Sequence, residues 1–261
     1  MQYVIGFFIA LFIALTGVGA GTLTVPVLVL FLNVPAAIAV GIGLTFSAVV
    51  KAILAPAQIA RGNVAWRTLG FMLLGGVPGV LLGSLLLRRL VTAGSENVLN
   101  AILGAILVGT ASWQILYSLR PGKAERSKRD RSPLLAWLMF PVGAEVGFSS
   151  AGAGALGSAA LLSLTPLVPA QVVGTDILFG FTVSLLGSGA HWLAGTASLV
   201  HGANPDLLLQ LIAGGIFGAI TGTLLSSKVP RRPLRFALWI WLLILGGDFL
   251  LNSYQVWAAT H

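Results

Sequence analysis

Charged residues are absent from long stretches of this chain, and apolar stretches separated by short polar loops recur along its whole length. A bilayer's hydrocarbon core of about 30 Å is crossed by about 20 apolar residues in helical form. The pattern predicts eight apolar segments, at Val4–Leu32, Ala36–Ala60, Leu69–Leu87, Val98–Leu119, Leu134–Leu164, Pro169–Ala194, Leu207–Leu225 and Phe236–Trp257. The chain is therefore expected to be an all-α integral membrane protein.

Two of these segments are interrupted by clustered glycines. The first contains Gly17-Val18-Gly19-Ala20-Gly21-Thr22, and the fifth contains Gly152-Ala153-Gly154-Ala155-Leu156-Gly157. Each glycine inside a helix costs about 1 kcal/mol relative to alanine. A helix broken at membrane depth is tolerated only where its freed backbone groups face protein or a water-filled cavity. Two such breaks, one in each half, are typical of a transporter built from repeats.

The two halves of the chain match in the order of their glycines. A shift of 133 residues places Gly21 on Gly154 and Gly41 on Gly174. After six inserted residues, a shift of 139 places Gly79 on Gly218. The match predicts an internal duplication within one integrated membrane domain, with the first membrane repeat at 1–119, a basic cytoplasmic linker at 120–132 and the second membrane repeat at 133–261.

The distribution of lysine and arginine favours one of two topologies. If all eight segments cross the membrane, eight basic residues lie inside and six outside. If the first and fifth segments are hairpins that enter and leave on one side, twelve lie inside and only Arg88 and Arg89 outside. The positive-inside rule favours the second topology. Three crossings per half then give an inverted-topology repeat with both termini outside, while eight full crossings, with the termini inside, remain the alternative.

Composition excludes several classes of protein. The chain is 57% hydrophobic and only 8% charged, and its mean hydropathy is +0.96. Its net charge of +8 comes mostly from short loops, where it sets topology, so nucleic-acid binding is not expected. There is no cysteine, no ATP-binding phosphate loop and no clustered metal-ligand motif, so no enzyme activity, metal or cofactor is expected. The N-terminus lacks the basic start of a signal peptide, so the first segment is expected to remain in the mature protein.

The paired breaks are the first candidate binding site. A helix that begins inside the membrane presents free N–H groups and the positive end of its dipole, which together bind an anion. Glycine lets a ligand approach the backbone, and nearby hydroxyl groups can donate hydrogen bonds. Close helix packing is the alternative role for such glycines. The candidate substrate-binding residues of the breaks are Gly17, Gly19, Gly21, Thr22, Ser149, Ser150, Gly152 and Gly154.

Lys51 is the first formal charge in the chain. It lies ten residues before Arg61, or about 15 Å along a helix, which places it near the middle of the membrane. An ionised lysine there costs at least about 2.5–3.5 kcal/mol. It could be a counter-charge for an anionic substrate, a snorkelling side chain or the partner of a buried carboxylate.

Three titratable groups in the second half are candidates for proton coupling or charge pairing. Asp176 follows the candidate binding residue Thr175, and Glu145 immediately precedes the second glycine cluster. Either acid could bind and release protons during transport, or could pair with Lys51. His191 occupies the repeat position of Gln58, and a lone membrane histidine is more often a hydrogen-bonded core residue than a proton relay.

Several stretches resemble the TauE/SafE family of sulfite and organosulfonate exporters, a group of bacterial membrane permeases. The stretch from Gly17 to Pro26 resembles the family's glycine-rich run ending in Val-Pro, and Arg61-Gly62-Asn63-Val64-Ala65-Trp66-Arg67 resembles its loop after the second segment. The stretches Gly75–Gly83 and Val173-Gly174-Thr175 are also similar to family motifs. The resemblance implies export of a small sulfur-containing anion across the inner membrane, with Gly17–Thr22 and Ser149–Gly154 flanking its path.

The sequence thus predicts a secondary transporter for a small anion, working by alternating access around a site at the membrane midplane. A negative interior drives each net negative charge outward by about 2.3 kcal/mol per 100 mV, which favours export. The expected partners are the anion and the lipid bilayer, and a homo-oligomer is left open. A membrane assembly subunit with no transport cycle and an anion channel are the alternatives.

Overall fold

The computed structural model describes residues 1–16, 20–93, 96–119, 130–151, 154–193, 205–225 and 231–260, and these form helices joined by short connections. Six helices are long and apolar enough to cross a membrane, namely α3, α4, α5, α8, α10 and α11. The all-α membrane fold is therefore confirmed. The helices are α1 (Gln2–Thr16), α2 (Ala20–Leu32), α3 (Ala36–Ala60), α4 (Trp66–Thr92), α5 (Glu96–Leu119), the 3₁₀ turn η1 (Ser132–Leu134), α6 (Leu135–Ser149), α7 (Ala155–Leu164), α8 (Pro169–His191), α10 (Pro205–Leu225) and α11 (Arg231–Thr260).

The first and fifth apolar segments are each broken into two short helices. The first segment forms α1 and α2, of 15 and 13 residues, or about 20 Å each, which is too short to cross the hydrocarbon core. The fifth forms α6 and α7, but its break lies earlier than the glycine cluster predicts. Ser150 adopts a left-handed conformation with φ 61° and ends α6, while Gly157 lies inside α7.

The fifth segment begins and ends at the same end of the bundle. The backbone N–H of Arg131, just before η1, donates a hydrogen bond to the carbonyl oxygen of Leu164 at the end of α7 (2.8 Å). At this end the backbone N–H of Ser132 donates a hydrogen bond to Oδ1 of Asp130. This bond holds the pKa of the exposed Asp130 carboxyl below its usual value, and the nearby positive charge of Arg67 lowers that pKa further. The start of α4 and the entrance of the α6–α7 hairpin are thus neighbours.

Each half supplies a short helix that packs against a long helix of the other half. On α4, Gly75, Gly79 and Gly83 lie against the backbone carbonyls of Ala136, Phe140 and Ala144 of α6. On α10, Gly214 and Gly218 lie against those of Tyr3 and Phe7 of α1. The two sets of contacts match each other. A shift of 139 residues relates the glycines, a shift of 133 relates their partners, and both shifts also align the halves of the sequence.

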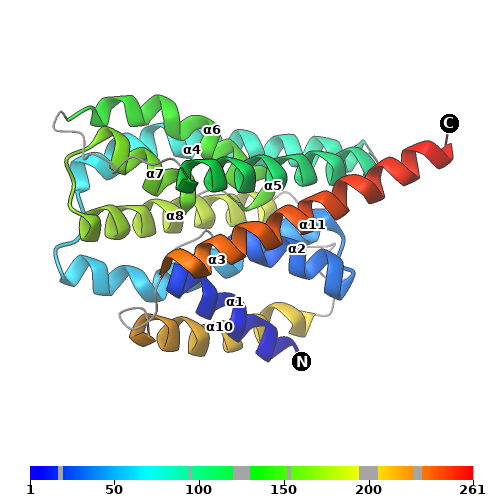
Figure 1. Cartoon of the computed structure of the whole chain (residues 1–261), viewed down its shortest axis with the longest axis horizontal. Helices are drawn as coiled ribbons and strands as arrows, with labels where there is room; N and C mark the ends of the chain where they lie inside the picture. The colour runs from blue at the N-terminus through cyan, green and yellow to red at the C-terminus, as the bar shows by residue number, and fades with distance from the viewer. Residues whose placement is uncertain are drawn as a thin grey trace.

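The helices α3 and α8 form the centre of the bundle. Figure 1 shows them in the middle of the view, with α4 and α6 above and α1 and α10 below, and with both chain ends on the right. Phe46 of α3 packs on Gly215 of α10, and Phe179 of α8 packs on Gly76 of α4. Both phenylalanines are fully buried, so this interface lies deep within the protein.

Candidate functional site

A line of polar and small residues follows the contact between α3 and α8. On α8, Asp176, Gly180, Ser184 and Ser188 recur every four residues and so share one helix face. The hydroxyl groups of Ser47 and Ser184 are 3.0 Å apart, and those of Thr45 and Ser188 are 2.7 Å apart. We call this line, made of Thr45, Ser47 and Lys51 on α3 and Asp176, Gly180, Ser184 and Ser188 on α8, the polar stripe.

Lys51 is the positive charge of the polar stripe. Its side chain is buried, with 6% of its surface exposed, and its Nζ lies against Gly180 of α8. A Cβ at position 180 would collide with Nζ and Cε of the lysine, so glycine makes room for the side chain in this position. Lys51 therefore points into the bundle and does not snorkel to the membrane surface.

Asp176 lies one turn from Gly180 and is close enough to Lys51 for their charges to attract each other. The hydroxyl of Ser158 on α7 donates a hydrogen bond to Oδ2 of Asp176 (2.9 Å), and Oδ1 lies against Gly157. The aspartate is buried, with 6% of its surface exposed. The structure thus brings together the predicted lysine, the predicted aspartate and the half-helix α7 that follows the second break.

The two helix breaks meet against α3 about two turns before Lys51. The backbone carbonyl and Oγ of Ser150 lie against Gly21 of α2, and Oγ also faces Gly43 of α3. Ser150 is 4% exposed, and its Oγ has no hydrogen-bond partner among the described residues. Gly154 is the residue before α7, and Thr22 is buried near the start of α2. The candidates Gly17, Gly19 and Gly152 lie outside the described residues.

Three predicted site residues form hydrogen bonds with backbone groups. The Ser149 hydroxyl donates to the carbonyl of Glu145 (2.9 Å), and Thr175 Oγ1 accepts a hydrogen bond from the backbone N–H of Ala65 (3.0 Å). Nε2 of the buried His191 lies 3.1 Å from the Gly147 carbonyl oxygen. These contacts tie loops and neighbouring helices together, as expected for a core histidine. Glu145 is not part of the polar stripe and lines a separate groove.

Sequence reasoning missed most of the polar stripe. Ser47, Ser184 and Ser188 carry no charge, and single serines are common in membrane helices. The four-residue spacing that starts at Asp176 is the signal that could have found them. Among the described residues, no group of three histidine, aspartate or glutamate side chains is arranged to hold a metal ion.

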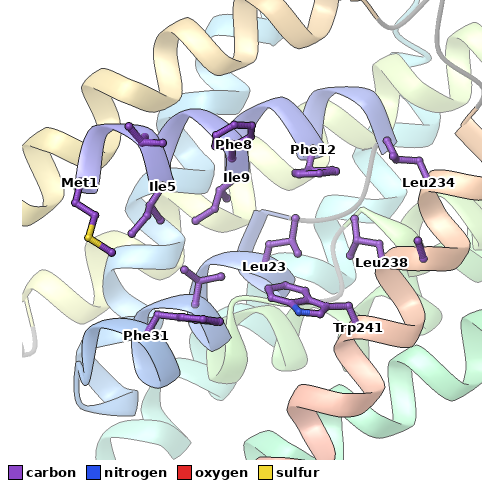
Figure 2. A pocket seen from close by; sticks show the side chains of 13 residues that line it. Met1, Ile5, Phe8, Ile9, Phe12, Leu23, Phe31, Leu234, Leu238 and Trp241 are labelled. Atoms are coloured by element: carbon purple, nitrogen blue, oxygen red, sulfur yellow. The ribbon is translucent and has the colours of Figure 1, made fainter.

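A second groove at the surface is apolar. It has a volume of about 510 Å³, lies between α1, α2 and α11, and is lined by side chains such as Phe8, Phe12, Phe31, Leu238 and Trp241 (Figure 2). Its lining side chains are all apolar, so they do not suit an anion.

Comparison with known proteins identifies the family. The sequence profile described as sulfite exporter TauE/SafE matches residues 3–249. The chain belongs to the TauE/SafE family. Together with the six apolar helices, this membership makes the chain a multi-pass membrane transporter. Membership of a membrane transporter family implies a small-molecule substrate and a lipid environment. Over 249 residues the chain is 27% identical to the "Probable membrane transporter protein YjnA" of Bacillus subtilis (strain 168), an alignment that covers 92% of this chain and 95% of the relative. No solved structure matches the chain.

Proposed function

We propose that this TauE/SafE transporter exports a small sulfur-containing anion, of the sulfite or organosulfonate class, across the inner membrane. The observation that carries the proposal is the buried Lys51 in the α3–α8 interface, near Asp176, which contacts the broken helix α7. A buried ammonium group, the N–H groups at the starts of α2 and α7, and the hydroxyl of Ser150 together suit a compact oxyanion.

The symmetry of the contacts supports a site at the membrane midplane. A shift of 133 relates Ser47 to Gly180 and Lys51 to Ser184. Exchanging the two halves therefore turns the contact between Ser47 and Ser184 into the contact between Gly180 and Lys51. If the halves are inverted repeats, the axis that relates them passes between these two contacts. Lys51 would then lie within a few ångströms of the midplane, where inverted-repeat transporters bind their substrates.

An inverted arrangement also accounts for the basic residues. The hydrogen bond from Arg131 to Leu164 supports a hairpin for the fifth segment, as the charge count favours. Figure 1 supports the same arrangement for the first segment, since α1 begins and α2 ends toward the right, where both chain ends lie. In this arrangement the start of α4, Asp130 and the start of α11 face the cytoplasm, and both termini face outward. Alternating access would then consist of one half rocking against the other.

A cysteine-accessibility experiment tests the topology, because the chain contains no cysteine of its own. Single cysteines are introduced at Ala60, Ala93 and Ala258, all of which are exposed, and intact cells are treated with a membrane-impermeant maleimide. We expect labelling from outside at positions 93 and 258 but not at 60. Ala60 and Ala93 are internal references, since both topologies agree on them. Labelling of position 258 only after cell lysis would indicate eight full crossings.

The substrate class is tested with purified protein in liposomes loaded with radiolabelled anion. We expect efflux of sulfite or a small sulfonate above that of protein-free liposomes, with unlabelled sulfite competing more strongly than chloride. Equal rates with and without protein for every sulfur anion tested would contradict the proposal.

A further inference from the structure

Glu145 lines a groove that is separate from the polar stripe. The groove has a volume of about 460 Å³ and lies between α4, α5 and α6, at the surface of the bundle. Apart from the hydroxyl of Thr110, the other side chains around it are apolar: Leu86, Ile102, Ile106, Ala144 and Phe148. A carboxyl group is thus placed in surroundings that resemble the lipid interior.

Nothing described in the structure neutralises this carboxyl group. Its Oε1 is buried and has no hydrogen-bond partner among the described residues. Among the side chains that the structure describes on the helices packed against α6, none that is charged or titratable lines the groove besides Glu145; these side chains are Lys51 on α3, Arg67, Arg88 and Arg89 on α4, and Asp176 and His191 on α8. An ionised carboxylate in such a place costs far more free energy than a neutral carboxylic acid.

The fold does not require an acid at this position. The shift of 133 that aligns the halves places Phe12 at the position of Glu145. Phe12 lines the apolar groove beside α1, where Figure 2 shows it among other hydrocarbon side chains. Since the first half fills the equivalent position with an apolar ring, packing alone does not explain the glutamate, and an intramembrane acid of this kind is a candidate for function.

We propose that Glu145 is a proton-binding site, protonated in the conformation seen here and accessible from the lipid-facing groove. Thr110 is a suitable acceptor for its O–H group, since the Thr110 hydroxyl donates its own proton to the Ile106 carbonyl (2.8 Å) and keeps an acceptor lone pair. A rearrangement that admits water or a cation to the groove would release the proton. The site adds proton exchange to the proposed transport cycle, but it rests on the groove and not on the identity of the anion.

An apolar carbodiimide tests this proposal, because the reagent reacts with a protonated carboxyl group in a lipid-facing site. The carboxyl oxygen bonds to the central carbon of the reagent and its proton moves to a reagent nitrogen; an acyl shift to nitrogen then gives a stable N-acylurea. The whole reagent is added and nothing leaves. Dicyclohexylcarbodiimide is applied to the full-length protein in liposomes over a range of pH, and the adduct is located by mass spectrometry.

We expect the adduct on Glu145, forming faster at low pH, and its loss in Glu145→Gln. Asp176 is the matched control, since it is also a membrane acid but lies buried beside Lys51 and Ser158, and it is expected to stay unmodified. An unmodified Glu145, or a rate that does not change with pH, would overturn the proposal. Infrared spectroscopy gives a second measurement, because a protonated carboxyl has a C=O band that Glu145→Gln should remove and that must be present if the proposal holds.

The failure of this proposal is distinguishable from failure of the proposed function. A Glu145 adduct in a protein that moves no sulfur anion supports the proton site and contradicts the anion. Anion flux in a protein whose Glu145 shows neither an adduct nor a protonated C=O band supports the anion and contradicts the proton site.

Discussion

Replacing Lys51 with methionine is expected to lower sulfur-anion flux at least about tenfold, which corresponds to about 1.4 kcal/mol of lost stabilisation along the transport path. Methionine fills a similar volume beside Gly180 but carries no charge for the anion. Flux is measured in liposomes containing equal amounts of protein, and size-exclusion chromatography monitors the folded state. Unchanged flux in a folded Lys51→Met variant would contradict a role for Lys51 in binding the anion.

A double substitution separates binding of the anion from pairing with Asp176. Lys51→Met alone leaves the buried Asp176 without the opposite charge of Lys51, and breaking a buried charge pair costs about 3–5 kcal/mol. The variant Lys51→Met/Asp176→Asn carries neither charge and should recover thermal stability. If the lysine binds the anion, flux stays low in the double variant. If it serves only to neutralise Asp176, flux returns with stability.

Replacing Gly79 with valine is expected to disrupt the contact between α4 and α6. A Cβ at this position collides with the Phe140 carbonyl and approaches the backbone nitrogen of Ala144, and neither group can move without moving α6. Overpacking of this kind costs about 1–3 kcal/mol or more. The measurement is the thermal midpoint and the monodisperse fraction after detergent extraction, both of which should fall.

Gly70→Val is the matched control on the same helix. Gly70 is exposed and has no atom within 4 Å of its added Cβ, so valine changes helix propensity there but not packing. Gly218→Val, which meets the Phe7 carbonyl on α1, should behave like Gly79→Val, since both glycines pack on a backbone carbonyl of a short helix. Equal stability of Gly79→Val and Gly70→Val would contradict the packing described here.

The position of the first break was predictable from the sequence, because glycine weakens a helix locally. The first break, between Thr16 and Ala20, falls at the predicted cluster. In the fifth segment the left-handed Ser150 ends α6 before the glycines begin, and a serine in that conformation leaves little trace in a sequence. Apolar length likewise predicts which helices are long enough to cross a membrane, but not their last turns, so α4 extends beyond both ends of Leu69–Leu87.

Contacts between distant helices were harder to foresee. The sequence singled out Lys51, Glu145 and Asp176 as buried charges, but it could not show that Asp176 lies near Lys51 while Glu145 faces a different groove. That difference depends on how α6 and α8 are rotated against α3 and α4, which the apolar pattern leaves undetermined. The shift of 139 residues matched glycines of α4 with glycines of α10, yet only the structure shows that each set packs on a short helix of the other half.

Efflux of labelled sulfite from liposomes held at imposed membrane potentials of both signs tests the central claim most directly. If the protein moves one net negative charge outward, each 100 mV of inside-negative potential supplies about 2.3 kcal/mol. That energy shifts the final distribution of the anion by about fiftyfold. We predict faster and more complete efflux with a negative interior, slower efflux with a positive interior, and loss of both in Lys51→Met. Sulfite movement no greater than in protein-free liposomes at either potential would contradict the account.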